Sequence, residues 1–436
     1  MDTLTSTPAL QFTVIFLALL STQFSLRVLL ALRQLRHVVR HRHAVPEAFE
    51  HAISLESHQR AADYTRAKVG LALSELLVHT LWLLLLSVGG GLAWVQSMLG
   101  TLWASVFPAE LPGPGLDYQL SLILTVIALG SLLDLPFSWW RHFVVDERFG
   151  FNRMTLRLWL SDGIKGVLVG AALGIPFLML VLWLMDRTAD HWWLWAWAAW
   201  MVFQIGVLVL WPTLIAPLFN RFEPLEDGPL RDRVEALLRR CGFSSSGLFV
   251  MDGSRRSTHG NAYFTGLGRA KRIVFFDTLM RQLGSHEIEA VLAHELGHFK
   301  HRHILQRMLL SAALSLAALA LLGWTMQQAW FYRGLGLVPL PGSQAACALV
   351  LFSLVLPVFL FPLQPLMSWW SRRHEFEADA YAARQTQPDD LISALVKLYK
   401  DNAATLTPDP LHSAIYDSHP PAPIRIARLR TLAALL

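Results

Sequence analysis

Seven long apolar stretches constrain this chain more than any other feature of its sequence. A helix needs about 20 mostly apolar residues to cross the roughly 30 Å hydrocarbon core of a bilayer. The stretches that meet this requirement are 9–30, 70–97, 118–140, 164–185, 192–218, 304–326 and 345–370. Hydrophobic residues make up 54% of the chain and charged residues only 16%, outside the range of soluble domains. The sequence therefore predicts a mainly α, polytopic membrane protein with about seven transmembrane helices.

The distribution of basic residues predicts how these helices are oriented. Seven Lys and Arg residues lie in 33–68 and five in 141–165, whereas 98–117 has none. Short cytoplasmic loops are enriched in Lys and Arg, so we assign both basic loops to the cytoplasm and the N-terminus to the outside. Seven crossings then place the C-terminus inside. The polar segments 219–303 and 371–436 share that side and are expected to fold together.

Three ionisable residues lie inside the predicted membrane helices. Glu75 and His79 are four residues apart in the second helix, and Asp134 is in the third. Ionisable side chains are costly in lipid, so they are expected to face one another or an internal cavity. Two interpretations stay open: hydrogen-bonded contacts between helices, and the lining of a cavity.

Cysteine content and charge exclude several other functions. The chain has two cysteines, Cys241 in a polar region and Cys347 in an apolar one, which excludes a disulfide framework and argues against a thiolate metal site. The net charge of +5 is modest, and no basic motif interleaved with aromatic residues is present. Nucleic-acid binding is therefore not expected.

A histidine-rich helix carries the motif with the clearest chemistry. Residues 294–298 read His-Glu-Leu-Gly-His, the H-E-x-x-H pattern. His294 and His298 project from the same helical face, so both can bind one Zn²⁺ ion. Glu295 can reach a water at the metal and act as general base. Ser285 is the expected N-cap of this helix. The alternative is a surface helix that is merely rich in histidine.

A catalytic zinc ion needs a third protein ligand. Metzincins take it from a histidine six residues beyond their motif. This chain has His301 where that class needs a glycine and Ile304 where it needs the histidine, so the class is excluded. His301 and His303 are interpreted as solvated groups, or as groups behind the ligands, near the membrane surface.

A second helix, directly after the last apolar stretch, offers the missing carboxylate. Glu375 and Asp379 lie four residues apart on one face, while Glu377 points elsewhere. We take Glu375 as the third ligand and Asp379 as the acceptor that orients a ligating histidine. The alternative is an ordinary charged surface helix, which this stretch taken alone would favour.

Several motifs in this order resemble those of the type I CAAX prenyl endopeptidase family, which are integral-membrane zinc proteases of the gluzincin class. The motifs are 143–152 (FVVDERFGFN), 161–166 (SDGIKG), 260–266 (GNAYFTG), 294–298 (HELGH), 375–379 (EFEAD) and 419–425 (HPPAPIR). The resemblance spans nearly the whole chain. It implies a zincin-like α+β metalloprotease domain on the cytoplasmic side. It also implies that the membrane helices enclose a chamber from which the zinc site is reached.

The resemblance also implies roles for three further residues. Residues 260–266 and 272–277 are expected to be strands joined by a turn at 266–270, and an exposed edge strand would bind an extended substrate by β-augmentation. Asn261 is then implied to hold the substrate main chain. His419 is implied to stabilise the oxyanion of the tetrahedral intermediate, and Arg425 to steady the zinc-site side chains.

These observations predict a zinc-dependent integral-membrane endopeptidase with one Zn²⁺ ion per chain, acting near the C-terminus of prenylated CAAX-type or similar membrane-associated peptides. The alternatives are a quality-control metalloprotease for membrane proteins and, less favoured, a transporter or lipid-handling protein with a structural zinc site. The expected regions are 1–218 (membrane domain with five helices and cytoplasmic loops 33–68 and 141–163), 219–303 (zincin catalytic region), 304–370 (helices six and seven) and 371–436 (the rest of the catalytic domain).

The expected partners are a peptide or protein substrate and membrane lipid, with no nucleic acid and no obligate protein partner. The chain ends without a dilysine retrieval signal, in the sequence LRTLAALL at 429–436. This favours a prokaryotic origin, and hence the bacterial inner membrane as the location.

Overall fold

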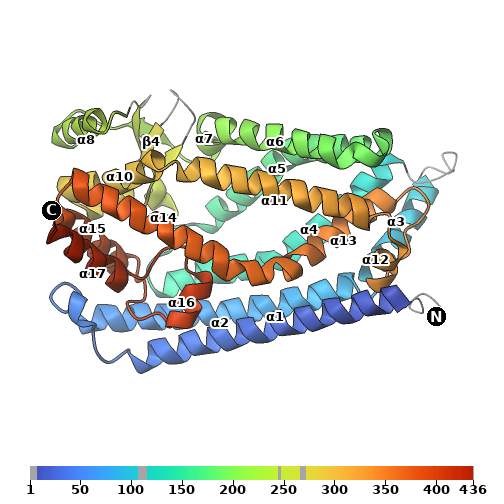
Figure 1. The fold of residues 1–436 in the computed structure, drawn as a ribbon, viewed down its shortest axis with the longest axis horizontal. Coiled ribbons are helices and arrows are strands. Elements are labelled where there is room, and N and C mark those ends of the chain that lie inside the picture. Colours follow the sequence, from blue (N-terminus) through green and yellow to red (C-terminus); the bar gives the residue numbers. More distant parts are fainter. Residues whose placement is uncertain (1–6, 107–114, 244–246, 266–271, 436) are drawn as a thin grey trace.

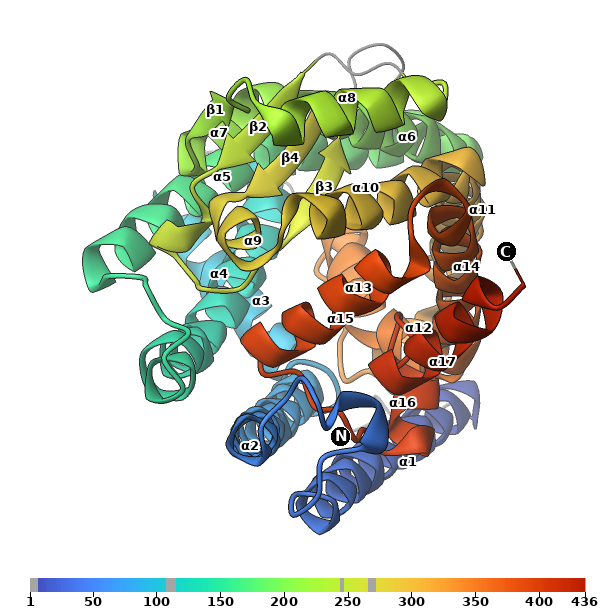
Figure 2. The same ribbon diagram turned by 90° about the vertical axis from the view of Figure 1, so that its left-hand side faces the viewer.

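Long helices make up most of the molecule, and a small sheet lies at one end of them (Figure 1). The computed structural model describes residues 7–106, 115–243, 247–265 and 272–435. Viewed along the long axis (Figure 2), the membrane helices stand around that axis, with α1 and α2 on the opposite side from α6. The sheet and the helices beside it face the viewer at this end.

The described residues contain seven helical stretches that are long and apolar enough to cross a membrane. They are α1 (Thr7–Arg40), α2 (Leu55–Leu86), α4 with η3 (Leu116–Asp146), α5 (Leu156–Arg187), η4 to α7 (Ala189–Phe219), α11 (His303–Thr325) and α13 to α14 (Gln344–Gln385). The parts of the composite stretches are α4 (Leu116–Trp140), η3 (Arg141–Asp146), η4 (Ala189–His191), α6 (Trp192–Leu210), η5 (Trp211–Ile215), α7 (Ala216–Phe219), α13 (Gln344–Leu360), η8 (Phe361–Leu363) and α14 (Gln364–Gln385). The predicted number of membrane helices is confirmed.

The second membrane helix ends earlier than the predicted stretch 70–97. α2 stops at Leu86, and a separate helix, α3 (Gly91–Val106), follows a turn. Gly90 has a φ of +75°, which favours glycine, and a Cβ at Gly91 would lie 2.6 Å from the Leu85 carbonyl oxygen. Both helices are apolar, so hydropathy alone does not show the turn between them.

The last membrane helix continues well beyond its apolar part. The predicted stretch ended at residue 370, but α13, η8 and α14 run without interruption to Gln385. Pro357 lies inside α13, and the short 3₁₀ turn η8 takes up the change of direction before α14. Glu375 therefore stands on the continuation of a membrane helix.

A four-stranded mixed sheet lies beside the predicted catalytic helix. Its strands are β1 (Phe222–Pro224), β2 (Leu248–Met251), β3 (Ala262–Thr265) and β4 (Arg272–Phe276), in the order β1-β2-β4-β3. β2 pairs with β4 in parallel, and the other two pairings are antiparallel. β3 is thus an edge strand, paired with β4 as predicted; the predicted turn at 266–270 lies outside the described residues.

One apolar core joins this sheet to helices from both polar segments. The helices are α8 (Pro229–Arg240), α9 (Asp277–Gln282), α10 (Ser285–Lys300), α15 (Pro388–Asp401) and α17 (Ala422–Ala433). Ile288 of α10 packs in this core with Leu391 of α15 and Leu429 of α17, and each is at most 2% exposed. Burying such a side chain contributes about 1.5–3 kcal/mol. The two segments predicted to fold together do so.

The remaining elements are short. They are α12 (Ala329–Gly334), α16 (Pro410–Tyr416), η2 (Glu47–Phe49) and η6 (Gly253–Arg255). α16 is fixed to α14, because Ser368 Oγ donates to the Ile415 carbonyl at 2.8 Å and Arg372 donates to the Asp417 carbonyl at 2.8 Å. These bonds hold the segment that leads into residue 419.

The ionisable residues of the membrane helices form two bridges from α2 to the α4–η3 stretch. Glu75 Oε1 lies 2.7 Å from a guanidinium nitrogen of Arg141, and His79 Nε2 lies 2.7 Å from Asp134 Oδ1. The structure thus shows the contacts between helices that the sequence left as one of two interpretations. The existence of an enclosed chamber, and its lining by these residues, stay predictions.

Candidate metal centre

Helix α10 carries the H-E-x-x-H motif on a firmly anchored scaffold. The helix begins at Ser285, so Gly284 is its N-cap and the predicted N-cap was one residue too late. Glu287 accepts a hydrogen bond from the Gly284 N–H at 2.7 Å and forms an ion pair with Lys397 of α15 at 2.8 Å. These contacts fix the start of α10 against α15, and the motif follows two to three turns later.

A glycine within the motif lets α14 approach α10 closely. A Cβ at Gly297 would meet the Ala378 Cα of α14 at 2.8 Å and its carbonyl oxygen at 3.1 Å. Any larger residue at 297 would therefore push the two helices apart. This close approach brings Glu375 of α14 to the two histidines of α10.

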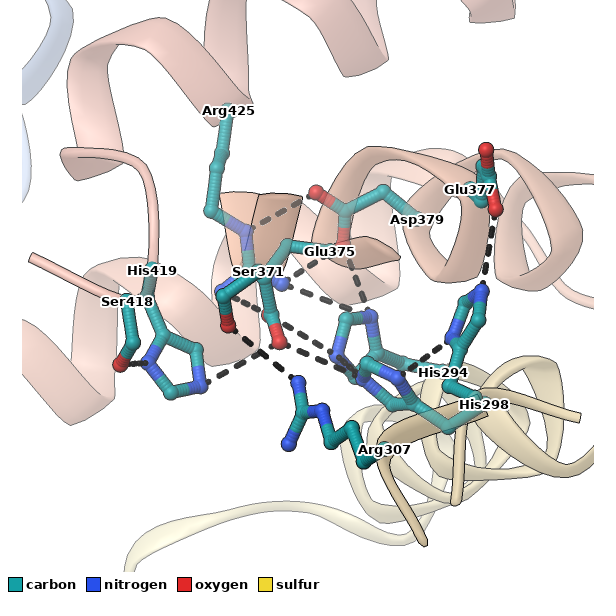
Figure 3. A network of polar contacts seen from close by, with 11 residues as sticks. His294, His298, Arg307, Ser371, Glu375, Glu377, Asp379, Ser418, His419 and Arg425 are labelled. Atoms are coloured by element: carbon teal, nitrogen blue, oxygen red, sulfur yellow. Dashed lines mark hydrogen bonds and ion pairs between the residues drawn. The ribbon is translucent and has the colours of Figure 1, made fainter. Parts of the chain in front are cut away.

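The three predicted ligand side chains converge on one point (Figure 3). Glu375 carboxylate oxygens lie 3.4 Å from His294 Nε2 and 3.4 Å from His298 Nε2, and the two Nε2 atoms are 3.3 Å apart. A tetrahedral ion with bonds of about 2.0–2.1 Å holds its ligand atoms about 3.3–3.4 Å from one another. A different oxygen of Glu375 faces each ring, so these separations fit a metal ion held by the two Nε2 atoms and this carboxylate.

The hydrogen bonds of the two rings also fit a metal. His294 Nδ1 lies 2.9 Å from Asp379 Oδ1, and His298 Nδ1 lies 2.9 Å from His303 Nδ1. If each Nδ1 donates, each Nε2 presents a lone pair to the same point, where Glu375 adds a carboxylate. Glu375 Oε2 is buried, and its charged neighbours are His294 Nε2 at 3.4 Å and Arg425 Nη1 at 3.8 Å. Such a cluster requires a positive charge at its centre.

The His294 side of the centre ends in a buried ion pair. Arg425 of α17 makes a bidentate ion pair with Asp379. Its Nε donates to Asp379 Oδ2 at 2.9 Å, and its Nη2 donates to Asp379 Oδ1 at 2.6 Å. Burial lowers the pKa of His294, but its hydrogen bonds to Asp379 and Glu375 outweigh burial and raise this pKa to about 9. The carboxylates of Asp379 and Glu375 thus favour a positive charge at the His294 ring.

The His298 side is built differently, through another imidazole. His303 Nδ1 faces His298, and His303 Nε2 lies 3.0 Å from Glu377 Oε2. The chain turns back between α10 and α11 at Arg302, whose φ of +57° is in the left-handed region. His303 is 1% exposed, so of the two interpretations the structure favours a group that stands behind the proposed ligand His298.

A cavity of about 270 Å³ opens at the centre. Glu295, His298, Glu375 and His419 line it, together with Tyr263, Phe264, Phe299, His303, Ile304, Arg307, Ser371 and Ser418. Glu295 makes no hydrogen bond or ion pair within the described residues, so its carboxylate is free to act in this cavity. Tyr263 and Phe264 belong to the edge strand β3, which thus borders the site.

His419 reaches the cavity from the opposite side to α10. Its Nε2 lies 3.4 Å from Glu375 Oε1, and Ser418 Oγ lies 3.0 Å from its Nδ1. The side chain is 64% exposed and lines the cavity, with protein on one side of the ring. This protein environment, together with the positive charge of Arg425, lowers the pKa of His419. A neutral ring that accepts from Ser418 presents its Nε2–H to the cavity.

Asn261 stands just outside this group of residues. It immediately precedes β3, and its side-chain oxygen accepts the Ala262 N–H at 2.8 Å. It is not among the residues that line the cavity, whereas Tyr263 and Phe264 are. The structure thus brings together the predicted ligands, Glu295, Asp379, His419 and Arg425, and leaves Asn261 at the edge.

The two motifs of the membrane half support the segment that leads to β3. Asn152 forms a β-bridge with Ser257, and Arg256 makes a two-armed ion pair with Asp162 at 2.9 and 3.1 Å. These contacts connect 143–152 and 161–166 to the loop before Asn261. Sequence reasoning missed Arg256, and it missed Arg372, which holds the segment before His419. Neither residue has a local signal, because their partners lie far away in the chain.

Comparison with known proteins identifies relatives along nearly the whole chain. Residues 34–221 match the family described as "CAAX prenyl protease N-terminal, five membrane helices", and residues 224–433 match peptidase family M48. CAAX prenyl protease 1 of Saccharomyces cerevisiae is 33% identical over 93% of this chain and 92% of its own length. The homologue from Arabidopsis thaliana is 34% identical over 89% and 90%. The crystal structure of Ste24p from S. mikatae superposes with a TM-score of 0.87 at 31% identity, covering 96% of this chain and 99% of that one.

Proposed function

The chain belongs to peptidase family M48 and is an integral-membrane metalloendopeptidase, and from this premise we propose the identity of its metal, its catalytic residues and its substrates. The metal is zinc, held by His294, His298 and Glu375. Glu295 is the general base, His419 stabilises the oxyanion, and Arg425 and Asp379 fix His294. The substrates are CAAX-type peptides, the class that the names of the relatives indicate.

The convergence of the three ligand atoms carries this proposal. His294 Nε2 and His298 Nε2 are 3.3 Å apart, and each lies 3.4 Å from a different oxygen of the buried Glu375 carboxylate. His294, His298 and Glu375 supply the two nitrogen ligands and one carboxylate ligand that catalytic zinc takes in gluzincins. Two of these side chains, His298 and Glu375, also line the cavity that Glu295 and His419 line, so a metal held there would act beside them.

The residues around this position divide the work of peptide hydrolysis. When bound, zinc polarises the scissile carbonyl and lowers the pKa of a water molecule toward neutrality. Glu295 accepts a proton from the attacking water and passes it to the leaving amine as the C–N bond breaks. The Nε2–H of His419 donates a hydrogen bond to the oxygen that becomes negative in the tetrahedral intermediate.

The edge strand β3 is the proposed binding surface for the substrate main chain. An extended peptide adds to an exposed strand edge through main-chain hydrogen bonds, and β3 borders the cavity through Tyr263 and Phe264. Asn261 stands at the start of this strand, where its side chain is positioned to extend the pairing by one residue.

We further propose the orientation in the membrane that the basic loops favour. The N-terminus lies outside, and the sheet, the metal centre and the C-terminus lie in the cytoplasm. The four regions bounded at 218, 303 and 370 are part of this proposal; for a prokaryotic chain, the membrane is the bacterial inner membrane. Support comes from the Lys and Arg residues of 33–68 and 141–165.

A cleavage assay on the purified chain in detergent tests the function. The substrates are a farnesylated C-a-a-X peptide and its unprenylated twin, and the proteins are wild type, Glu295→Gln and wild type treated with a chelator. We expect the wild type to cut the farnesylated peptide, the Glu295→Gln protein to lose turnover while retaining one zinc ion, and the chelated protein to regain activity when zinc returns.

Each other outcome has a definite meaning. Equal cleavage of both peptides would keep the zinc mechanism and shift the substrate toward membrane proteins in general, as in quality control. Unchanged turnover in the Glu295→Gln protein would refute the assigned general base. No cleavage at one zinc ion per chain would contradict the substrate class.

A further inference from the structure

A second group of metal-ligating side chains lies directly behind the proposed zinc site. His301, His303 and Glu377 each offer one ligand atom, and these atoms lie within 4.8 Å of one another. The group shares no residue with the three zinc ligands, but His303 touches one of them, His298, at 2.9 Å. Two imidazoles and one carboxylate again make up the donor set.

The members of this group differ in how freely they can move. His303 is fully buried, while Glu377 is partly buried and holds His303 Nε2 through its Oε2 at 3.0 Å. The His301 ring is exposed, makes no side-chain hydrogen bond within the described residues, and stacks over His303 with centroids 5.5 Å apart. A tetrahedral ion needs donors about 3.3 Å apart, so His301 must move inward by roughly 1–1.5 Å. Its exposed ring is free to do this.

We propose that His301, His303 and Glu377 form a second, inhibitory site for a divalent transition-metal ion, coupled to the catalytic centre through His303. The inference rests on the proposed zinc centre, whose ligand His298 is the point at which the second ion acts. Imidazole and carboxylate donors suit Zn²⁺ and its neighbours Co²⁺ and Ni²⁺ better than Mg²⁺ or Ca²⁺.

The coupling follows from the tautomer that His303 must adopt. With zinc on His298 Nε2, the His298 Nδ1–H donates to His303 Nδ1, so the single proton of His303 is on Nε2 and points at Glu377. A second ion needs the Nε2 lone pair, and binding moves that proton to Nδ1. Two N–H groups then face each other, and His298 loses its acceptor. Loss of such a partner typically costs about 10–100-fold in metal affinity or activity.

The charges around the group make the second site the weaker of the two. Lys300 and Arg302 flank His301 in the sequence, and Arg373 Nε lies 3.1 Å from Glu377 Oε1. These cations oppose a further positive ion, whereas the catalytic site is buried and has Asp379 behind it. The second ion is therefore expected to bind only after the first, when the free metal concentration is higher.

Metal counting gives a test that does not depend on activity. The full chain in detergent is stripped with a chelator, reloaded by equilibrium dialysis at increasing Zn²⁺, and analysed for zinc per chain. We expect two successive steps in wild type and only the first in the His301→Phe protein. His191→Phe is the matched control, because His191 is also exposed but lies at the far end of the membrane helices; it should keep both steps.

The cleavage rate at the same zinc concentrations tests the coupling. We expect the second step in wild type to lower kcat about 10–100-fold with little change in KM, and the His301→Phe protein to keep its rate. Normal activity of that protein at one zinc per chain shows that it is folded, and His301→Asn provides a second variant. Equal inhibition of both proteins, or a second ion retained by His301→Phe, would overturn the proposal. Absence of cleavage at one zinc would count only against the proposed substrate, since the metal count still decides the second site.

Discussion

The two histidines of the metal centre are supported in contrasting ways. Behind His294 stand Asp379 and Arg425, whose side chains are 1% and 8% exposed. Behind His298 stands His303, followed by Glu377 and Arg373. The side chains of Glu377 and Arg373 are 34% and 65% exposed. Each arrangement gives a ligand Nδ1–H an acceptor and ends in an arginine–carboxylate pair. One pair is sealed inside the protein, and the other meets solvent.

Because of this difference, the support of His294 is rigid, whereas the support of His298 can change its hydrogen bonding. A buried ion pair holds its geometry rigidly, but removal of one partner leaves an uncompensated charge in the interior. An exposed pair is screened by water and contributes little, so the acceptor on that side can change its state at small cost. On the proposed assignment, the His294 side would hold the metal rigidly, and the His298 side is where the proposed second ion would act on it.

The largest expected effect is on the buried side. Arg425→Leu removes the guanidinium that pairs with the buried Asp379 and leaves that charge only its hydrogen bond to His294 among the described contacts, which should cost about 3–5 kcal/mol in the free energy of unfolding and release zinc from His294. Thermal denaturation and zinc content of the purified protein measure both effects. Arg425→Lys is the control, because it keeps the charge and should recover part of the stability. Full zinc retention by Arg425→Leu would contradict the role assigned to the pair.

The next effect is on His303. His303→Phe removes the acceptor of His298 Nδ1–H and should lower zinc affinity or kcat about 10–100-fold, while leaving folding intact. His303→Asp restores an acceptor, as Asp379 does for His294, and should recover much of the loss. Zinc affinity measured by competition with a chromogenic chelator distinguishes the two variants. If the two variants bind zinc equally weakly, His303 acts through packing and not through this hydrogen bond.

An effect of similar size, but on stability and not on zinc binding, is expected where α10 itself is anchored, and it should not distinguish the two sides. Burial raises the pKa of Glu287, but hydrogen bonds from Lys397, Ser393 and the Gly284 N–H outweigh it, so the pKa is lowered from its usual 4.5. A lowered carboxyl pKa stabilises the fold above about pH 4.5, and this contribution is lost as the pH falls through the folded-state pKa.

Glu287→Gln tests this anchor. The variant should lose about 1.5–3 kcal/mol near neutral pH, and its difference from wild type should shrink as the pH falls below 4.5. Thermal denaturation of the zinc-free proteins at several pH values measures this without interference from metal loss. A difference that stays constant down to acid pH would show that the charge of Glu287 is not its source.

The smallest expected effect is on the exposed side. Arg373→Leu removes the partner of Glu377 but leaves the His303 hydrogen bond, so zinc content and kcat should change by less than about two-fold. Comparison with Arg425→Leu in the same assay gives the contrast directly. An effect of Arg373→Leu as large as that of Arg425→Leu would remove the distinction between the two sides.

The sequence by itself determined the features that depend on short spacings. Apolar runs of about 20 residues gave seven membrane helices, and the i, i+4 spacing placed His294 with His298 and Glu375 with Asp379 on shared faces. The strands expected at 260–266 and 272–277 follow from a local pattern in the same way, and the structure has them at 262–265 and 272–276. The periodicity of a helix or strand is local, so these inferences needed no knowledge of the fold.

Tertiary structure alone decided where distant elements meet. The end of α2 at Leu86 depends on a turn between two apolar helices, and the approach of α14 depends on Gly297 facing Ala378. His303 becomes the acceptor of His298 only because the chain reverses at Arg302, a residue whose type does not signal a left-handed φ. Arg425 reaches Asp379 across 46 positions of sequence. Contacts of this kind arise from packing between helices, and no local pattern in the chain records them.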